Sequence, residues 1–195
     1  MVINVLAICG SVRHGSYNHL LMKEAIKLAP GNLHFEEFDL SKLPRFDPNL
    51  EASSVKECED FLAKVAFCDA IMIVTPEYNA SIPGYLKDAF DWASRPPHRP
   101  ILGKIAVVMG ASTGHFVATA RAQSHVRQIG ASLDFLMISK PEVLLADASS
   151  KFDSNGLTDL GTIARLKELL SKLESLCNTS KALKQIELVD VRLPA

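Results

Sequence analysis

Residues 10 to 18 combine small, hydroxyl, amide and basic side chains in the sequence Gly-Ser-Val-Arg-His-Gly-Ser-Tyr-Asn. If a helix starts here, its first N–H groups point outward with the positive end of the helix dipole and bind anions. Ser11, Ser16 and Asn18 add side-chain donors, and Arg13 adds a positive charge. The run therefore predicts a site for a phosphomonoester. A helix cap by Ser16 or Asn18 is the alternative, but capping leaves Ser11 and Arg13 unexplained.

The spacing of the glycines in this run argues against two other phosphate-binding motifs. Gly10 and Gly15 match neither G-x-G-x-x-G nor a Walker loop, which needs Lys and then Ser or Thr after its second glycine. The sequence has Ser16 and Tyr17 at those places. Nucleoside triphosphate hydrolysis and a Rossmann dinucleotide turn are therefore disfavoured.

A second candidate run, Pro-Glu-Tyr-Asn-Ala-Ser-Ile-Pro at residues 76 to 83, has a proline at each end. Proline fixes its own φ and restricts the residue before it, so we expect the backbone amides of residues 77 to 79 to be held against a planar ligand. A flavin ring needs such donors along its N5 and carbonyl edge. The alternative is an ordinary strand-to-helix loop in which Pro83 starts the helix.

The elements that would position these runs alternate along the chain. Apolar or β-branched runs predict strands at residues 3–9, 34–39, 70–75, 105–109 and 133–138. Helical periodicity predicts helices at residues 18–28, 53–65, 84–93, 119–129 and 163–176. Apolar strands joined by helices indicate a doubly wound α/β domain, whose parallel sheet carries helices on both faces. Ligands bind at the carboxyl ends of such strands, where both runs fall.

The composition describes one globular domain of 195 residues. Lys and Arg total 21 and Asp and Glu total 22, so there is no basic field to hold nucleic acid or an anionic membrane. The first residues lack a basic leader and no apolar run reaches the about 20 residues of a membrane span, so we expect a cytoplasmic protein with a small-molecule partner. The cysteine and histidine spacings match no metal motif, so we expect free thiols and no metal.

The two runs together resemble the NAD(P)H-dependent FMN reductase family, which includes quinone, chromate and azo reductases. The family motifs are GS-hydrophobic-R-x-x-S-x-N and PEYN-x-S-x-P-G-x-L-K-N-A-x-D-W, and the chain has GSVRHGSYN and PEYNASIPGYLKDAFDW, with Asp88 in place of the usual asparagine. The resemblance covers about residues 1 to 160. It implies a flavodoxin-like fold with a five-stranded sheet in the order 2-1-3-4-5. We expect a single domain over residues 1–195, with a C-terminal extension after about residue 177.

The resemblance implies an enzyme that passes a hydride from NADPH or NADH through FMN to small acceptors such as quinones, free flavin, chromate or azo compounds. FMN performs the chemistry, so no side chain is assigned a catalytic role. Family members often self-associate around the flavin, so a homodimer or homotetramer is expected, in part through residues 95–100. The residues expected to bind FMN come from three loops: Ser11, Arg13, Ser16, Tyr17, Asn18, Pro76, Glu77, Tyr78, Asn79, Ser112, Thr113 and Gly114.

Two other functions fit parts of the sequence. Residues 110 to 114 satisfy G-x-S-x-G, the nucleophile elbow of α/β-hydrolases. Hydrolase triads run Ser, then Asp or Glu, then His, and no acidic residue lies between Ser112 and His125, which argues against a serine hydrolase. A non-catalytic FMN-binding sensor or electron carrier of the same fold is the other alternative. The net charge of −1 argues against a carrier, because such carriers are strongly acidic.

Overall fold

The centre of the molecule is a parallel sheet whose middle strands are buried on both faces. The computed structural model describes residues 1–95 and 97–190, and only the backbone of residues 184 and 186–190. The strands β1 (Ile3–Cys9), β3 (Ala70–Val74) and β4 (Ile105–Ala111) are almost entirely buried, as continuous apolar runs require. With β2 (Leu33–Phe38) and β5 (Leu136–Met137) they pair in the order β2-β1-β3-β4-β5, which confirms the predicted order.

The fifth position of the sheet differs from the prediction, because two short strands replace one. β5 pairs with Ile105 and Ala106 of β4, and β6 (Val143–Leu145) pairs with the other end of β4, at residues 109 to 111. Pro141 lies between them and has no N–H to donate to a strand ladder. The prediction of one strand over residues 133–138 was therefore wrong in its extent.

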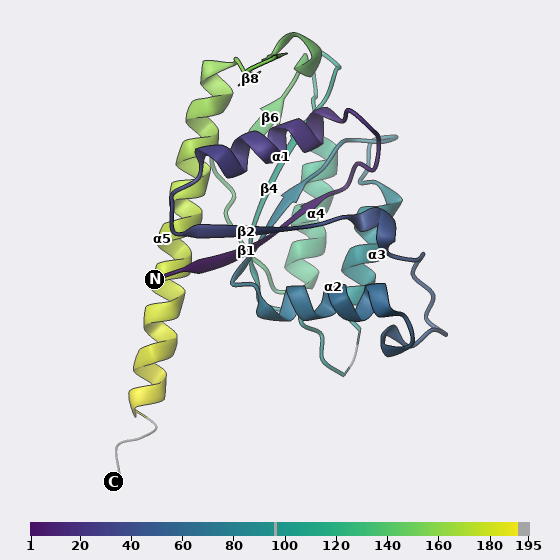
Figure 1. Cartoon of the computed structure of the whole chain (residues 1–195), viewed down its shortest axis with the longest axis vertical. Coiled ribbons are helices and arrows are strands. Elements are labelled where there is room, and N and C mark those ends of the chain that lie inside the picture. Colours follow the sequence, from purple (N-terminus) through teal and green to yellow (C-terminus); the bar gives the residue numbers. More distant parts are fainter. Residues whose placement is uncertain (96, 191–195) are drawn as a thin grey trace.

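Helices cover both faces of the sheet (Figure 1). One face carries α1 (Tyr17–Leu28) and α5 (Leu160–Asp190), and the other carries α2 (Lys56–Phe67), α3 (Gly84–Ala93) and α4 (Ala120–Ser132). Alternate strand residues supply the two cores, so that Val5 packs toward α1 and α5 while Leu6 packs toward the other three. The remaining elements are short: η1 (Leu40–Lys42), η2 (Ala52–Ser54), η3 (Ala148–Ser150), β7 (Phe152–Asp153) and β8 (Gly156–Leu157).

The last helix is longer than its predicted range of residues 163–176. Its first half buries leucines at helical spacing, including Leu166 and Leu173, against the sheet. Beyond Cys177 the helix continues past the edge of the sheet (Figure 1), and Lys181 pairs there with Asp69 at 2.7 Å and donates to the Val2 carbonyl at 2.9 Å. The expected C-terminal extension is thus helical as far as residue 190, and residues 191–195 lie outside the described part.

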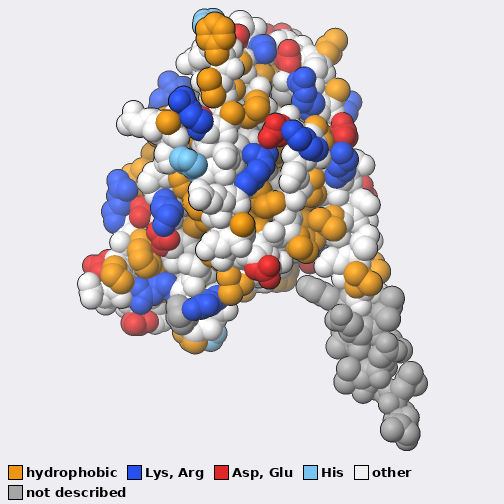
Figure 2. Space-filling model, turned by 180° about the vertical axis from the view of Figure 1, so that it is seen from behind, with side chains coloured by type: hydrophobic (Ala, Val, Ile, Leu, Met, Phe, Trp, Pro, Cys, Tyr) orange, Lys and Arg blue, Asp and Glu red, His pale blue; other side chains and the backbone are white. Residues whose placement is uncertain are grey.

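The surface charge is mixed and the cysteines are unpaired, as the composition of the chain predicts. Seen from behind, the molecule mixes acidic, basic and hydrophobic side chains without a large field of one sign (Figure 2). All four cysteines are buried and free, which confirms the prediction, and burial raises the pKa of Cys9 to about 12. No helix in the described part of the chain has the length and apolar character needed to cross a bilayer.

Candidate functional site

A cavity of about 310 Å³ opens at the carboxyl edge of the sheet, between the loops that follow β1, β3 and β4. Of the twelve residues predicted to bind FMN, Asn79 and Gly114 lie outside its lining and the others line it. Ala111 also lines the cavity and was missed, because a small apolar side chain carries no chemical signal. The lining consists of Ser11, Arg13, Ser16, Tyr17, Asn18, Pro76, Glu77, Tyr78, Ala111, Ser112 and Thr113.

The first loop is held in shape by its own capping and by the sheet. Ser16 is the N-cap of α1 and its Oγ accepts from the Asn18 N–H at 3.2 Å, so the capping interpretation is correct for Ser16. The buried Asn18 amide donates to the Ala111 carbonyl at 2.9 Å and accepts from the Ala111 N–H at 2.8 Å. Asn18 therefore joins the start of α1 to the end of β4, with one amide hydrogen left over.

The same loop keeps donors that the protein does not use. Ser11 is 2% exposed, and its nearest side-chain partner is the Tyr78 hydroxyl at 3.5 Å. Arg13 is exposed and forms no ion pair with any described residue. In the first turn of α1 the Asn18 N–H is taken by Ser16 Oγ, but the Tyr17 and His19 N–H groups meet no acceptor among the described residues. Gly15 lies at φ +65°, a left-handed conformation that suits glycine and turns the loop toward the helix.

The second loop contains a tight turn over residues 78 to 81. Tyr78 and Ser81 exchange backbone hydrogen bonds of 3.0 Å each, and Asn79 and Ala80 between them have φ of 49° and 63°. Two consecutive positive φ values define a type I′ turn. The Tyr78 N–H is consumed within this turn, so the expectation that it faces a ligand was wrong. The N–H groups of Glu77 and Asn79 meet no acceptor among the described residues.

This turn is fastened to the start of α4 by side chains. The Glu77 carboxylate is 6% exposed and accepts from the Arg121 N–H at 2.9 Å, the Ala122 N–H at 3.2 Å and the Arg121 Nε at 2.6 Å. Ser81 Oγ lies 3.0 Å from His125 Nδ1, one turn further along the helix. A carboxylate at a helix N-terminus is favoured by the helix dipole. The side chain of Glu77 therefore positions the loop, and Glu77 also lines the cavity.

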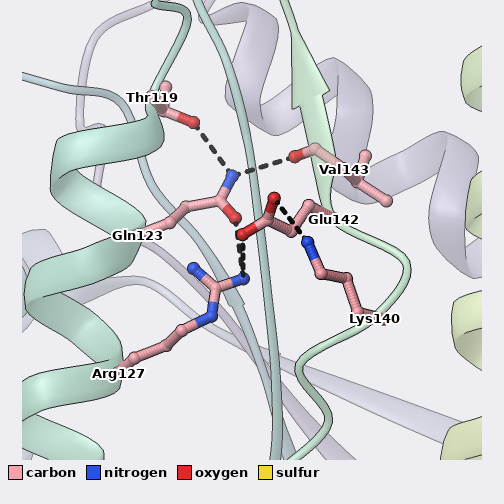
Figure 3. Close-up of polar contacts among 6 residues, drawn as sticks. All are labelled: Thr119, Gln123, Arg127, Lys140, Glu142 and Val143. Carbon is pink, nitrogen blue, oxygen red and sulfur yellow. Dashed lines mark hydrogen bonds and ion pairs between the residues drawn. The ribbon is translucent and has the colours of Figure 1, made fainter.

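The start of α4 is in turn tied to β6 by a buried amide (Figure 3). Gln123 is fully buried, and its Nε2 donates to Thr119 Oγ1 at 3.0 Å and to the Val143 carbonyl at 2.9 Å. Arg127 lies 3.6 Å from the Glu142 carboxylate at the outer end of this network. Because α4 holds Glu77, this network also fixes the second loop relative to the sheet.

The third loop does not form a nucleophile elbow. Ser112 Oγ accepts from the Gly114 N–H at 3.0 Å, and His115 pairs instead with Asp147. Across residues 1–95 and 97–190, no histidine nitrogen hydrogen-bonds Ser112 Oγ. The G-x-S-x-G pattern at residues 110–114 is therefore not a hydrolase triad, because the serine has no base.

The donors around the cavity fit FMN. One side offers Arg13, the Ser11 and Ser16 hydroxyls and the first N–H groups of α1, which match a phosphomonoester dianion. The other side offers the unpaired N–H group of Glu77, and the unpaired N–H group of Asn79 lies just outside the lining on the same turn of fixed shape. Such donors match the acceptor atoms of a planar ring. A phosphate joined to a ring through a short linker would use both sides at once.

Fold and site together define a flavodoxin-like, flavin-binding protein. Residues 3–150 match the family model described as NADPH-dependent FMN reductase. The chain thus belongs to the NADPH-dependent FMN reductase family and is an oxidoreductase that uses FMN and NAD(P)H. The resemblance inferred from the two sequence motifs is confirmed.

Similar proteins cover most of the chain. A NAD(P)H-dependent FMN reductase of Pseudomonas aeruginosa is 44% identical over 155 residues, which are 79% of this chain and 83% of the relative. A NAD(P)H:quinone oxidoreductase of Solanum tuberosum is 40% identical over 183 residues, which are 90% and 93% of the two chains. The solved structure of FerB, a flavoenzyme NAD(P)H:(acceptor) oxidoreductase of Paracoccus denitrificans, superimposes with a TM-score of 0.84 at 31% identity, covering 91% of this chain and 98% of FerB.

Proposed function

We propose that this oxidoreductase binds FMN in the 310 Å³ cavity and reduces small acceptors there, quinones among them. The observation that carries the proposal is the pair of unused donor sets on opposite sides of one cavity. Arg13 and the start of α1 lie on one side and the Glu77 N–H on the other, with the unpaired Asn79 N–H two residues further along, just outside the lining. Relatives named quinone oxidoreductase and quinone reductase, at 40% and 33% identity, support quinones as acceptors. Free flavin, chromate and azo compounds are further candidate acceptors.

The residues divide the work between binding and positioning. Arg13, Ser11 and Ser16 would bind the FMN phosphate, and the Glu77 and Asn79 N–H groups would hold the edge of the ring and stabilise charge on it. Bound FMN supplies the redox chemistry, taking a hydride from NAD(P)H and passing the electrons to the acceptor. Tyr78, half exposed, reaches across the cavity toward Ser11 and narrows it between the two loops.

The third loop supplies the remaining proposed contacts. Ser112 and Thr113 line the cavity, and Gly114 follows them with its N–H turned back to Ser112 Oγ. The Ser112 N–H donates to the Leu145 carbonyl at 2.8 Å, so the groups of this loop that remain for the ligand are the two hydroxyls and the Thr113 N–H. We therefore assign this loop a smaller share of the binding than the first two.

The proposal is tested by the visible spectrum of the purified protein after addition of FMN, followed by steady-state oxidation of NADPH and NADH with a benzoquinone. We expect flavin bands that shift on binding and continuous consumption of the reduced nucleotide. A bound flavin without turnover would mean a sensor or carrier instead of an enzyme. A spectrum identical to that of free FMN, with no turnover, would remove the proposed site.

We also propose a cytoplasmic homodimer or homotetramer. Four free thiols are typical of a reducing compartment. Phe116, 97% exposed, and Val117, 46% exposed, lie on the loop beside the cavity, where a second copy would cover them. The expected contribution of residues 95–100 includes residue 96, which lies outside the described residues. Light scattering of the purified protein at several concentrations tests the oligomer, and a monomeric mass at all of them would contradict it.

A further inference from the structure

A second and larger cavity lies on the opposite side of the first loop. This groove, of about 500 Å³, runs between that loop, α1 and the segment after β2. Arg13 lines both the groove and the flavin cavity, so the two are neighbours that share this residue. The basic side chains in the groove are Arg13, His14, His19 and Lys42.

Most of these basic side chains have no hydrogen-bond or ion-pair partner within the described part of the protein. Arg13, His14 and Lys42 are exposed, and within the described chain their side chains make no hydrogen bond or ion pair. Together with His19 they come from three separate places, the first loop, α1 and η1, and line one groove. Convergence of unpaired cationic donors from different elements is the arrangement that recognises phosphate.

The two acidic residues of the groove are already engaged. Glu37 pairs with Lys23 at 2.6 Å. Asp39 accepts from the N–H and the Oγ of Ser41 at 2.9 and 2.7 Å. Its burial alone would raise the pKa of Asp39, but the Ser41 hydrogen bonds and the charges of Lys42 and His19 bring the pKa below its usual value. The carboxylate thus holds η1 in place, and Lys42 is left to face the groove.

We propose that this groove binds the 2′-phosphate of NADPH, an inference that rests on the proposed function. The 2′-phosphate lies at the adenosine end of the donor, far from the nicotinamide that must reach the flavin ring. The groove likewise lies beyond the first loop from the ring side of the flavin cavity. Arg13 stands between the two and is placed to offset repulsion between the FMN phosphate and the donor.

The chemistry of the groove favours a monoester over the pyrophosphate that NADH and NADPH share. A terminal phosphate presents three acceptor oxygens and close to two negative charges, which suit donors arriving from several directions. Lys42 on η1 and His19 on α1 line the groove from different elements and can bind separate oxygens. The inference therefore predicts that the groove discriminates NADPH from NADH.

The test uses the FMN-loaded protein and compares KM for NADPH and NADH in Lys42→Glu and Lys42→Arg. Lys42→Glu is expected to raise the KM for NADPH about tenfold or more, and to change the KM for NADH and the Kd for FMN by less than about threefold. Lys42→Arg keeps the charge and should retain most of the NADPH preference. Lys56→Glu, a reversal of an exposed lysine outside the groove, is the matched control and should change neither KM.

A second measurement needs no variant. In the unaltered protein, 2′-AMP should compete with NADPH at least fivefold more strongly than 5′-AMP, and Lys42→Glu should remove that difference. Two results would overturn the inference: an equal rise in the KM for NADPH and for NADH in Lys42→Glu, or equal inhibition of the unaltered protein by 2′-AMP and 5′-AMP. These outcomes are separate from failure of the proposed function, because that failure is seen as absent flavin binding or absent turnover in the unaltered protein.

Discussion

The two loops that face the flavin cavity are built in opposite ways. The turn at residues 76–81 directs the side chains of Glu77 and Ser81 into α4, where both form hydrogen bonds, and only Tyr78 extends its side chain toward the first loop. The loop at residues 10–18 keeps Arg13 and His14 without a partner among the described residues. The turn is fixed by contacts within the protein, whereas the charged side chains of the first loop remain available to bind a ligand.

This difference separates two kinds of effect. Contacts already formed without ligand stabilise the fold and preorganise the site, so their loss lowers the free energy of unfolding of the apoprotein. Groups without protein partners contribute to affinity alone. Substitutions in the turn and in the loop should therefore divide between stability and binding, and the following variants test that division.

The largest effect is expected for Gly110→Ala, at the end of β4 beneath both loops. A Cβ there would lie 2.2 Å from the Thr75 carbonyl oxygen and 2.4 Å from Thr119 Oγ1. The carbonyl is backbone of the loop after β3, and Thr119 is the N-cap residue of α4 with its hydroxyl bound to Gln123, so neither can move without disturbing the sheet or α4. We expect a loss of about 3 kcal/mol or more in the free energy of unfolding, measured by urea denaturation of the apoprotein.

Gly114→Ala is the control for this variant. Its Cβ would meet only Ser112 Oγ, at 3.4 Å, which is an ordinary contact. We expect a change below about 0.5 kcal/mol in the same measurement. If the two alanine variants lost the same free energy of unfolding, the close approach of the backbone at Gly110 would not be the reason for the destabilisation.

The next effect is expected for Glu77→Ala. The substitution leaves two backbone N–H groups and the Arg121 guanidinium without their acceptor, which should lower the free energy of unfolding of the apoprotein by about 2–4 kcal/mol. Glu51→Ala, which removes an exposed carboxylate without a side-chain cap hydrogen bond, should change it by less than about 0.5 kcal/mol. An apoprotein as stable as the unaltered chain would mean that α4 does not hold the turn.

The sequence predicted which residues line the cavity better than it predicted the role of each side chain. Polar residues that follow apolar strands are visible in sequence, so ten of the lining residues could be named. The partner of Glu77 lies 44 residues away on α4, and nothing local to either residue indicates the pairing. For the same reason Asn18 was given a ligand role, although Ala111, 93 residues further on, engages most of its amide.

The fold was predictable where local pattern and burial agree. The bounds of α3 were predicted as observed, because its apolar stripe is complete and Pro83 precedes it. The length of α5 was missed, since its apolar periodicity ends near Cys177. The signal that could have extended it is composition: residues 181–185 read Lys-Ala-Leu-Lys-Gln, all strong helix formers. The first half of α5 is helical because it packs against the sheet, and the second half is helical because of the helix propensity of its residues.

On the loop side, Arg13→Ala should act on binding alone. A charge-assisted hydrogen bond contributes about 1.5–3 kcal/mol, so the Kd for FMN should rise about 10- to 150-fold in a fluorescence titration. Because Arg13 has no protein partner in the described structure, the unfolding of the apoprotein should change by less than about 0.5 kcal/mol. A rise in Kd below about threefold would contradict its role, and Lys56→Ala controls for loss of a positive charge.

The smallest effect is expected for Ser81→Ala, which removes the contact with His125 at the far end of the turn. A single neutral hydrogen bond is worth about 0.5–1.5 kcal/mol, so the apoprotein should lose about that much stability in urea. The Kd for FMN should change by less than about threefold, because Glu77 still fastens the turn and the Tyr78 to Ser81 backbone hydrogen bonds remain. If Ser81→Ala instead weakened FMN binding as much as Arg13→Ala, the hydroxyl itself would be a ligand contact. The ring side would then depend on free donors as the phosphate side does, and the contrast between the two loops would fail.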